Sequence, residues 1–333
     1  MRWPMRVEWW ACPAAASLCT ALAVLVFPEC VTAEELVVSL WGTSMIGAPY
    51  AVAMENGYFK QAGISITGIV GGSGGGNVVR AVLANPLPYG EVATPAAIAA
   101  RQQGLPIVAV NGGVLAADNV WVTLPSSKVT AIKDLVGKRI AYTTPKSISE
   151  AFLRAVLKIN SIEPQSLTLV AAGGISEGLT MLDSAAVDAA LTVEPIHTIR
   201  KNKYKDLFAV RDILSPVLSN VGITTREFAA RHPEIIRAII EGRRQGVEFV
   251  YGHPQEAGRI LARAYHMPEE ICIEAVAAMV KARYWVAGEF DVELLNNLAD
   301  ALRATGALSG DVNWGELMDV SMLPPDLKAK GSH

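Results

Sequence analysis

A glycine-rich stretch at residues 71–76 is the segment of this sequence best suited to chemistry. Five of its six positions are glycine, and the exception is Ser73. An apolar run typical of a β-strand precedes the stretch, and a helical pattern beginning near Asn77 follows it. Such a turn can bind a phosphate, present a catalytic serine, or hold another ligand with its backbone amides.

The residues after the last glycine exclude the nucleotide-binding interpretations. A phosphate-binding P-loop needs a lysine followed by Ser or Thr, but Asn77 and Val78 follow Gly76. The dinucleotide fingerprint G-x-G-x-x-G fits no register of these glycines. We therefore expect no nucleotide and no other cofactor.

A serine hydrolase is harder to dismiss, because residues 71–75 match the pattern G-x-S-x-G with Ser73 at its centre. The turn, however, follows only the second expected strand, and no HGGG-type oxyanion segment precedes it. We expect no catalytic residue and keep hydrolysis by Ser73 as an alternative of another class. Its base would come from the downstream histidines, His197, His232, His253 and His266.

Metal chemistry has little support in the sequence. There is no HExxH motif and no pair of histidines at helical spacing. Three of the four cysteines lie within the first 30 residues, and Cys272 is the only later one. We expect no metal site. Backbone amides remain as the functional groups of the glycine turn, and the following helix adds partial positive charge at its N-terminus.

The first 33 residues have the pattern of a secretory signal. Arg2 and Arg6 precede an apolar run at residues 11–27, and Val31 and Ala33 fit the small-residue rule for cleavage after Ala33. The run is short for a membrane span, which needs about 20 residues. We predict a signal peptide over 1–33 and a periplasmic mature protein, with an uncleaved anchor as the alternative.

Composition indicates a folded protein with a large core. Of the 333 residues, 51% are hydrophobic and 18% are charged, and the net charge is −3 without a block of like charges. A nucleic-acid-binding protein would carry a basic patch. The composition therefore argues against a nucleic-acid partner.

Strands and helices alternate twice along the chain after residue 34. Expected strands fall at 36–41, 64–70, 90–95 and 106–113, and then at 118–125, 138–144, 167–172 and 188–195. Alternation of this kind predicts an α/β fold with mostly parallel sheets flanked by helices. Beyond residue 224 the pattern is helical. Ser147 with Glu150, and Thr224 with Glu227, read as capping boxes.

The two halves of this pattern resemble each other. In each half a strand, a glycine turn and a helix lead to a proline, at Thr94-Pro95 in the first and at Glu194-Pro195 in the second. Ligands of open α/β sheets bind outside the carboxyl ends of the strands. Two such modules facing each other would bring both glycine turns to one cleft.

Four segments resemble a known family: residues 49–67, 134–144, 181–195 and 228–242. Together they are similar to the periplasmic substrate-binding proteins of ABC importers, in the NMT1/THI5-like branch for nitrate, sulfonates, taurine and thiamine-precursor pyrimidines. The resemblance implies a type II fold of two hinged lobes. Lobe 1 would hold residues 34–120 and 221–333, lobe 2 would hold 121–220, and the hinge would cross near 119–125 and 215–222. It also implies a permease partner in the inner membrane, and we expect a monomer.

The resemblance places ligand contacts in the loops that follow the strands: Trp41, Thr43, Ser44, Ser73, Gly74, Thr94, Asn119, Thr144, Ser147, Glu194 and Asn220. The helix N-termini at the glycine turns favour an organic anion, a sulfonate or a carboxylate, aromatic ones included. A neutral pyrimidine-like heterocycle is the alternative, suggested by Trp41 and Glu194. The cysteine-rich motif of the pyrimidine-synthesising relatives has no counterpart in the sequence, so we expect binding rather than catalysis.

Overall fold

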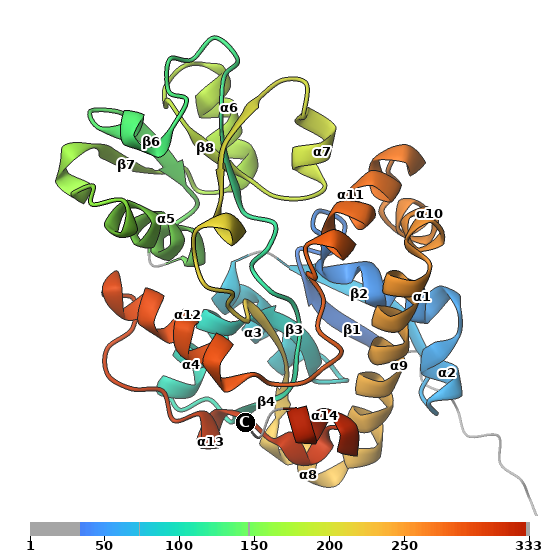
Figure 1. The fold of residues 1–333 in the computed structure, drawn as a ribbon. Helices are drawn as coiled ribbons and strands as arrows, with labels where there is room; N and C mark the ends of the chain where they lie inside the picture. The colour runs from blue at the N-terminus through green and yellow to red at the C-terminus, as the bar shows by residue number, and fades with distance from the viewer. Residues whose placement is uncertain (1–33, 73, 146, 331–333) are drawn as a thin grey trace, which may run out of the picture. The chain divides into compact units, whose positions relative to one another are not determined.

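Two β/α modules follow one another along the chain (Figure 1). The computed structural model describes residues 34–72, 74–145 and 147–330. The predicted signal peptide and its cleavage site lie outside the described residues. No described helix is both long enough and apolar enough to cross a membrane.

The first module contains a five-stranded sheet with the strand order β2-β1-β3-β10-β4. Strand β1 runs parallel to β2 and β3, whereas β10 runs antiparallel to β3 and β4. Strand β10 therefore joins the sheet from a distant part of the sequence. The strands are β1 (Glu34–Ser39), β2 (Ile66–Gly72), β3 (Tyr89–Ala93), β4 (Ile107–Gly112) and β10 (Asn220–Thr225).

The second module contains two smaller sheets. One has the order β8-β5-β9 with antiparallel neighbours, and the other pairs β6 with β7 in parallel. The chain passes from the first sheet to the second between β4 and β5, and it returns between β9 and β10. The strands are β5 (Val120–Thr123), β6 (Arg139–Tyr142), β7 (Thr168–Ala171), β8 (Ala190–Thr192) and β9 (Lys205–Ala209).

Helices lie beside both sets of strands, and the last third of the described chain is mostly helical (Figure 1). In the two modules they are α1 (Ala48–Glu55), α2 (Tyr58–Gln61), α3 (Gly75–Ala84), α4 (Thr94–Gln102), α5 (Ile148–Ile159), α6 (Ile175–Asp183) and α7 (Ile196–Arg200). After β10 come α8 (Arg226–Arg231), α9 (Pro233–Gly252), α10 (Pro254–Tyr265), α11 (Glu269–Lys281), α12 (Val292–Ala304), α13 (Trp314–Leu317) and α14 (Pro325–Lys330).

The predicted α/β class is confirmed, with three differences in detail. The strands that join at the crossings, β5 and β10, run antiparallel to their neighbours, because a chain returning from the other module enters from the opposite end. Strands β9 and β10 were not predicted. The predicted cap at Thr224 is wrong by one residue: Thr225 caps α8 by accepting from the Phe228 amide at 3.1 Å, while Thr224 is buried within β10.

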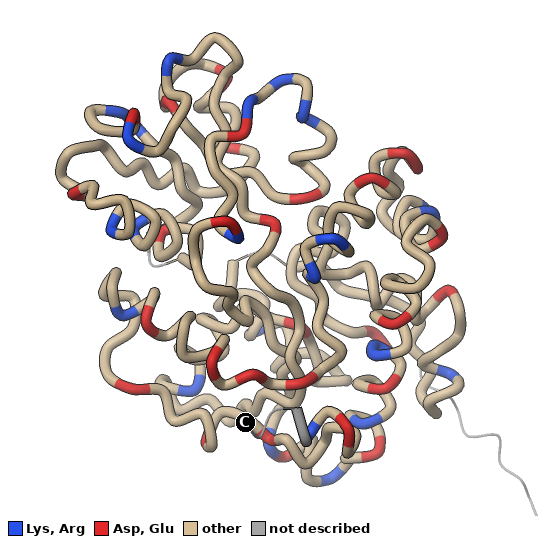
Figure 2. The backbone as a smooth tube through the Cα atoms, in the orientation of Figure 1, with Lys and Arg blue, Asp and Glu red and all other residues tan. Residues whose placement is uncertain are grey.

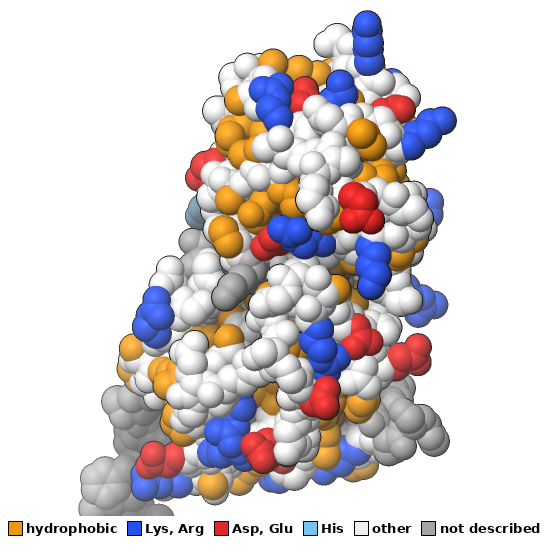
Figure 3. All heavy atoms as spheres, turned by 90° about the vertical axis from the view of Figure 1, so that its left-hand side faces the viewer, with side chains coloured by type: hydrophobic (Ala, Val, Ile, Leu, Met, Phe, Trp, Pro, Cys, Tyr) orange, Lys and Arg blue, Asp and Glu red, His pale blue; other side chains and the backbone are white. Residues whose placement is uncertain are grey.

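Acidic and basic residues are scattered along the described backbone without a long stretch of one sign (Figure 2). On the face drawn in Figure 3, hydrophobic side chains lie among scattered Lys, Arg, Asp and Glu. The face drawn in Figure 3 thus has the mixed charge that the composition predicted.

One ion pair lies inside the first module. Arg243 on α9 and Glu91 on β3 are 1% and 0% exposed, and the guanidinium Nε donates to Glu91 at 2.9 Å. Arg243 also donates to the carbonyl oxygens of Val286 and Gly113, at 2.8 and 2.7 Å, and the Tyr50 hydroxyl donates to Glu91 at 2.8 Å. These bonds connect β3, α9 and the chain after α11 through the core.

Candidate ligand-binding site

A cavity of about 510 Å³ lies where the loops of both modules converge. It is bordered by the carboxyl ends of the parallel strands β1, β2, β3, β6 and β7, and by the residues that lead into β5 and β10. This is the position at which open α/β sheets bind ligands.

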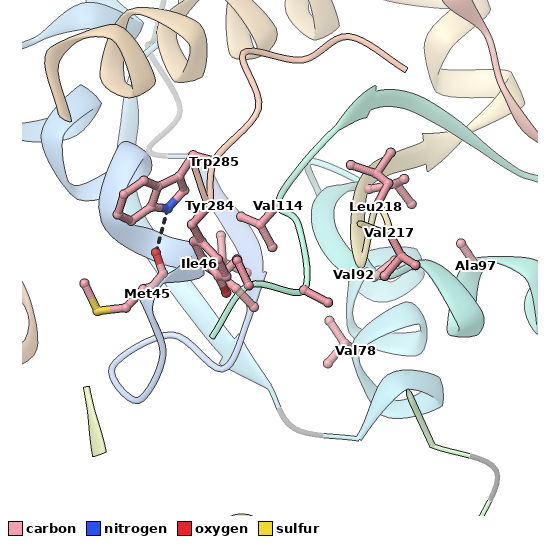
Figure 4. Packing of buried hydrophobic residues seen from close by; sticks show 14 of the residues in the cluster. Met45, Ile46, Val78, Val92, Ala97, Val114, Val217, Leu218, Tyr284 and Trp285 are labelled. Carbon is pink, nitrogen blue, oxygen red and sulfur yellow. Dashed lines mark hydrogen bonds between the residues drawn. The ribbon is translucent and has the colours of Figure 1, made fainter. Parts of the chain in front are cut away.

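Much of the cavity wall is apolar. Side chains from several elements line it, including Ile46, Val78, Ala96, Ile148 and Leu191. Ile46 and Tyr284, which are far apart in the sequence, lie close together in Figure 4, and the neighbouring Trp285 indole donates to the Met45 carbonyl at 2.8 Å. A wall of this composition can enclose the carbon skeleton of a small organic molecule.

Several helix N-termini face the cavity. The residues at the starts of α3, α5 and α6 all line it: Gly74 to Gly76, Ser147 with Ile148, and Gly174 with Ile175. Gly74 has a φ of 76°, which a residue with a side chain would adopt only with strain. The first amides of a helix have no partner within it and favour negative charge.

Three hydroxyl groups at the start of α5 form one cluster on the cavity wall. The oxygens of Thr143, Ser147 and Ser149 lie 2.7 to 3.1 Å apart. Ser147 also accepts from the Glu150 amide at 3.3 Å, so it caps the helix as the sequence predicted. Hydroxyl hydrogens can rotate, so the cluster can turn donors toward an acceptor in the cavity.

Asp118 is also among the residues that line the cavity. Its side chain is buried and accepts a hydrogen bond from the side-chain Nδ2 of Asn119 at 3.0 Å. Burial raises the pKa of Asp118 to about 7, and the charge of Glu194 acts in the same direction. Hydrogen bonds from its own backbone amide, from Tyr284 and from Asn119 lower the pKa and offset part of this rise.

The family model described as NMT1/THI5 like matches residues 47–257, which is more than half of the chain. The chain belongs to the NMT1/THI5-like family. The resemblance predicted from the sequence is thereby confirmed.

Relatives of this NMT1/THI5-like chain include both a synthase and binding proteins. A 4-amino-5-hydroxymethyl-2-methylpyrimidine phosphate synthase of Legionella pneumophila is 19% identical over 67% of this chain and 71% of its own. The periplasmic aliphatic sulphonate binding protein SsuA of Escherichia coli has a TM-score of 0.69 at 13% identity, over 86% of this chain and 91% of its own. The alkanesulfonate-binding protein SsuA of Xanthomonas axonopodis pv. citri, bound to MOPS, has a TM-score of 0.67 at 15% identity, over 86% and 97%.

These structural similarities establish that this NMT1/THI5-like chain has the type II periplasmic-binding-protein fold. Of the ligand residues predicted from sequence, the cavity wall includes Ser44, Gly74, Asn119, Thr144, Ser147 and Asn220. Ser73 lies outside the described residues.

Four predicted residues of the NMT1/THI5-like chain do not line the cavity. Trp41 packs its ring edge-on against Tyr265 with the centroids 5.0 Å apart. Thr43 donates to the Leu40 carbonyl at 3.0 Å, and Thr94 is buried and donates to the Leu218 carbonyl at 2.9 Å. In each case the side chain serves the local turn or the core.

Glu194 is the fourth of these residues, and its carboxylate is used by its neighbours. It accepts from the Thr198 amide at 3.2 Å and lies 3.2 Å from Nδ1 of His197. The other ring nitrogen of His197 lies 2.7 Å from Asp206. This arrangement makes Glu194 a structural partner of His197 at the start of α7.

The same arrangement predicts a pH dependence of stability. The hydrogen bond to Glu194 raises the pKa of His197 to about 9, burial opposes it, and Asp206 adds to the rise. The stabilisation is complete below the unfolded pKa near 6.5 and is lost as the pH rises toward 9. We expect the free energy of unfolding in urea to fall by about 1–2 kcal/mol between pH 6.5 and 9.5, and His197→Gln to remove most of this dependence. If the free energy of unfolding fell equally with pH in the wild type and in His197→Gln, the prediction would be wrong.

Sequence reasoning missed Asp118, Ser149 and Tyr284, which also line the cavity. Asp118 directly precedes the predicted Asn119. Its place just before a strand could have identified it as a candidate lining residue. Tyr284 follows α11, and nothing in the sequence links that position to loops some 170 residues earlier. Among the described residues, no group of three potential metal ligands is present.

Proposed function

We propose that this protein is the solute-binding receptor of an ABC importer, and that it captures a small organic anion, a sulfonate or a carboxylate, aromatic ones included. The receptor acts in the periplasm and delivers the ligand to a membrane permease without changing it. The observation that carries the proposal is the cavity, where three helix N-termini and an apolar wall face the same space. Family membership supports the same assignment.

The polar part of the cavity wall suits the anionic group of such a ligand, and the apolar part suits its carbon skeleton. The amides at the starts of α5 and α6, with the hydroxyl cluster, would hold the anionic group. Val78, Ala96 and Leu191 would pack on the carbon skeleton. No lysine or arginine occurs among the described lining residues, so amides and hydroxyls would supply the charge stabilisation.

Capture requires that the ligand contact both modules. A ligand favours the closed state only by binding it more tightly than the open one. The hinge, predicted near residues 119–125 and 215–222, would lie slightly earlier in the chain, at the crossings 113–119 and 210–219, because 120–123 form β5 and 220–225 form β10. The lobes would be residues 34–120 with 221–333, and residues 121–220. The receptor would work as a monomer, and the permease would recognise its closed state.

Two other functions have weaker support. The relative named as a pyrimidine phosphate synthase keeps a neutral heterocycle as the alternative ligand. Trp41 and Glu194, which suggested that ligand, do not line the cavity. For the serine hydrolase, the described part of the cavity wall contains no histidine to act as a base.

Thr144 offers a direct test of the anion site. It lines the cavity, and its hydroxyl makes no hydrogen bond within the described part of the chain. We expect titration calorimetry to detect binding of alkanesulfonates or aromatic carboxylates, and Thr144→Val to weaken it by roughly tenfold through the loss of one donor to a charged group. Thr43→Val is the matched control, because Thr43 lies outside the cavity wall, and it should bind like the wild type.

The outcomes separate the candidate functions. Tight binding of pyrimidines with no response to sulfonates or carboxylates would overturn the anion proposal. Turnover of a model ester, with labelling by a serine-directed probe that Ser73→Ala abolishes, would favour the hydrolase instead.

A further inference from the structure

We propose that residues 284–288, which we call the brace, form a third strand of the hinge and confine its bending to residues 117–118 and 215–216. This inference rests on the proposed function, because it specifies the movement by which the receptor would close on its ligand. Hinges bend at a few loop residues whose backbone dihedral angles absorb the rotation of the lobes. The pairing of the backbone along the two crossings indicates which residues those are.

The brace pairs with the beginning of the first crossing. The Leu115 amide donates to the Tyr284 carbonyl at 2.8 Å, and the Val286 amide donates to the Gly113 carbonyl at 3.1 Å. The two segments run antiparallel, as in a β-ladder. The first crossing is thus held by a segment that follows α11, far from it in the sequence.

The second crossing pairs with the other side of the same residues. The Gly113 amide donates to the Asn220 carbonyl at 2.9 Å, and the Ala116 amide donates to the Val217 carbonyl at 3.2 Å. This pairing is also antiparallel. Residues 113–116 are therefore the middle strand of three, with the brace on one side and residues 217–220 on the other.

Two glycines at the start of this middle strand are required by the close approach of its neighbours. A β-carbon on Gly112 would lie 2.3 Å from the Glu289 carbonyl oxygen, and one on Gly113 would lie 2.8 Å from the Asn220 carbonyl oxygen. Both obstacles are backbone atoms, which cannot turn aside as the end of a flexible side chain can. The start of the first crossing therefore lies between two adjacent segments with little room to move.

The brace is in turn anchored to the first module. The Trp285 indole donates to the Met45 carbonyl (Figure 4). The Tyr251 hydroxyl, on α9, donates to the Trp285 carbonyl at 2.8 Å and accepts from the Trp285 amide at 3.2 Å. Arg243, on the same helix, donates to the Val286 carbonyl at 2.8 Å. Because of these bonds, the brace and the residues paired with it would move as part of the lobe that contains α9.

Backbone pairing is interrupted once on each crossing. Among the described residues, no hydrogen bond between backbone groups involves residues 117–118 or 215–216. Beyond these stretches the pairing resumes, where the Val210 amide donates to the Asn119 carbonyl at 2.9 Å beside the paired strands β5 and β9. Each crossing thus has two held ends and an unpaired stretch between them, and rotation of the lobes would change the dihedral angles of that stretch.

In the described chain, the unpaired stretches are connected to their surroundings by hydrogen bonds from side chains. These bonds run from Arg211 to the Ala117 carbonyl, from Asn297 to the Pro216 carbonyl, and from Tyr284 to the Asp118 carboxyl group. A side chain can follow a moving partner by changing its rotamer, whereas a backbone ladder cannot.

Hydrogen exchange of single amides, resolved by mass spectrometry of the ligand-free protein, locates the bend. We expect the amides of Leu115 and Ala116 to exchange at least about 100-fold more slowly than those of Ala117 and Ser215, after correction for intrinsic rates. Similar rates in the two sets would overturn the proposed position of the bend.

Tyr251→Phe tests the brace, because it removes the hydroxyl that bonds to both backbone groups of Trp285. We expect exchange of the Leu115 amide to become about tenfold faster. The radius of gyration from small-angle X-ray scattering should increase, because the lobes would separate more often. Tyr58→Phe is the matched control: Tyr58 is another half-buried tyrosine of the first module, and its hydroxyl accepts from Asn56 at 3.1 Å. Both measurements should keep their wild-type values in this variant.

A second variant attacks the brace at another anchor. Trp285→Phe removes the indole donor to the Met45 carbonyl and should change both measurements in the same direction. Circular dichroism establishes that each variant is folded. Unchanged exchange of the Leu115 amide in both variants, or faster exchange without a larger radius of gyration, would overturn the brace and leave the proposed receptor intact. Failure of every anionic probe to bind the wild type would overturn the proposed anion receptor, whereas the brace, which is measured without ligand, would stand.

Discussion

Replacement of Arg243 by methionine is expected to lower the free energy of unfolding by about 3–5 kcal/mol, because it leaves the Glu91 carboxylate buried without its cation. The variant also loses the guanidinium donors to the carbonyls of Val286 and Gly113. A loss of this size is a large share of the stability of a typical protein, which is about 5–15 kcal/mol. Urea unfolding followed by circular dichroism would measure it.

Arg244 provides the control on the same helix. It is a quarter exposed and pairs with Glu248 and Asp326 near the surface, so Arg244→Met should cost less than about 1 kcal/mol. Adding Glu91→Gln to Arg243→Met should restore part of the lost stability, since no uncompensated charge would remain. If Arg243→Met and Arg244→Met lowered the free energy of unfolding by similar amounts, the buried ion pair would contribute no more to stability than the surface pair.

Replacement of Gly246 by alanine is expected to destabilise the protein by about 2–3 kcal/mol through overpacking. Gly246 lies in α9 where this helix meets α1, and a β-carbon there would collide with the backbone carbonyl of Pro49. Because the obstacle is backbone rather than a flexible side chain, the two helices would have to move apart. Thermal and urea unfolding of the variant would measure the cost.

Gly252, the last residue of the same helix, supplies the comparison. A β-carbon at this position meets nothing within 4 Å, so Gly252→Ala should leave stability unchanged or raise it slightly through helix propensity. Equal effects of the two substitutions would attribute the loss to propensity and contradict the packing argument.

Most of the fold was predictable from local patterns. Alternating apolar residues located β1 to β8 within a few residues, and the capping box identified the start of α5 at Ser147. Strand β9 escaped prediction because its sequence, "KDLFA", mixes charged residues with a short apolar run. Strand β10 was missed as well, and its direction depends on pairing with strands more than 100 residues earlier.

The site was predictable in part, and the reason differs between residues. Ser147, Gly74 and Thr144 follow strands or begin helices, where the family resemblance placed ligand contacts, in line with the rule that ligands bind at the carboxyl ends of strands. The same rule chose Thr94, whose hydroxyl turns instead to the Leu218 carbonyl. Tertiary packing decides which way a side chain points. It also decides that Tyr284 lines the cavity.

The place of β10 in the first sheet has a consequence for how the chain folds. It lies between β3 and β4, so residues 34–112 alone would leave these two strands without the neighbour that joins them. The five-stranded sheet can close only after residue 220 is available, and closing so long a loop is slow. A nascent chain would thus keep this sheet incomplete for most of its synthesis, which would suit the export across a membrane that we propose for it.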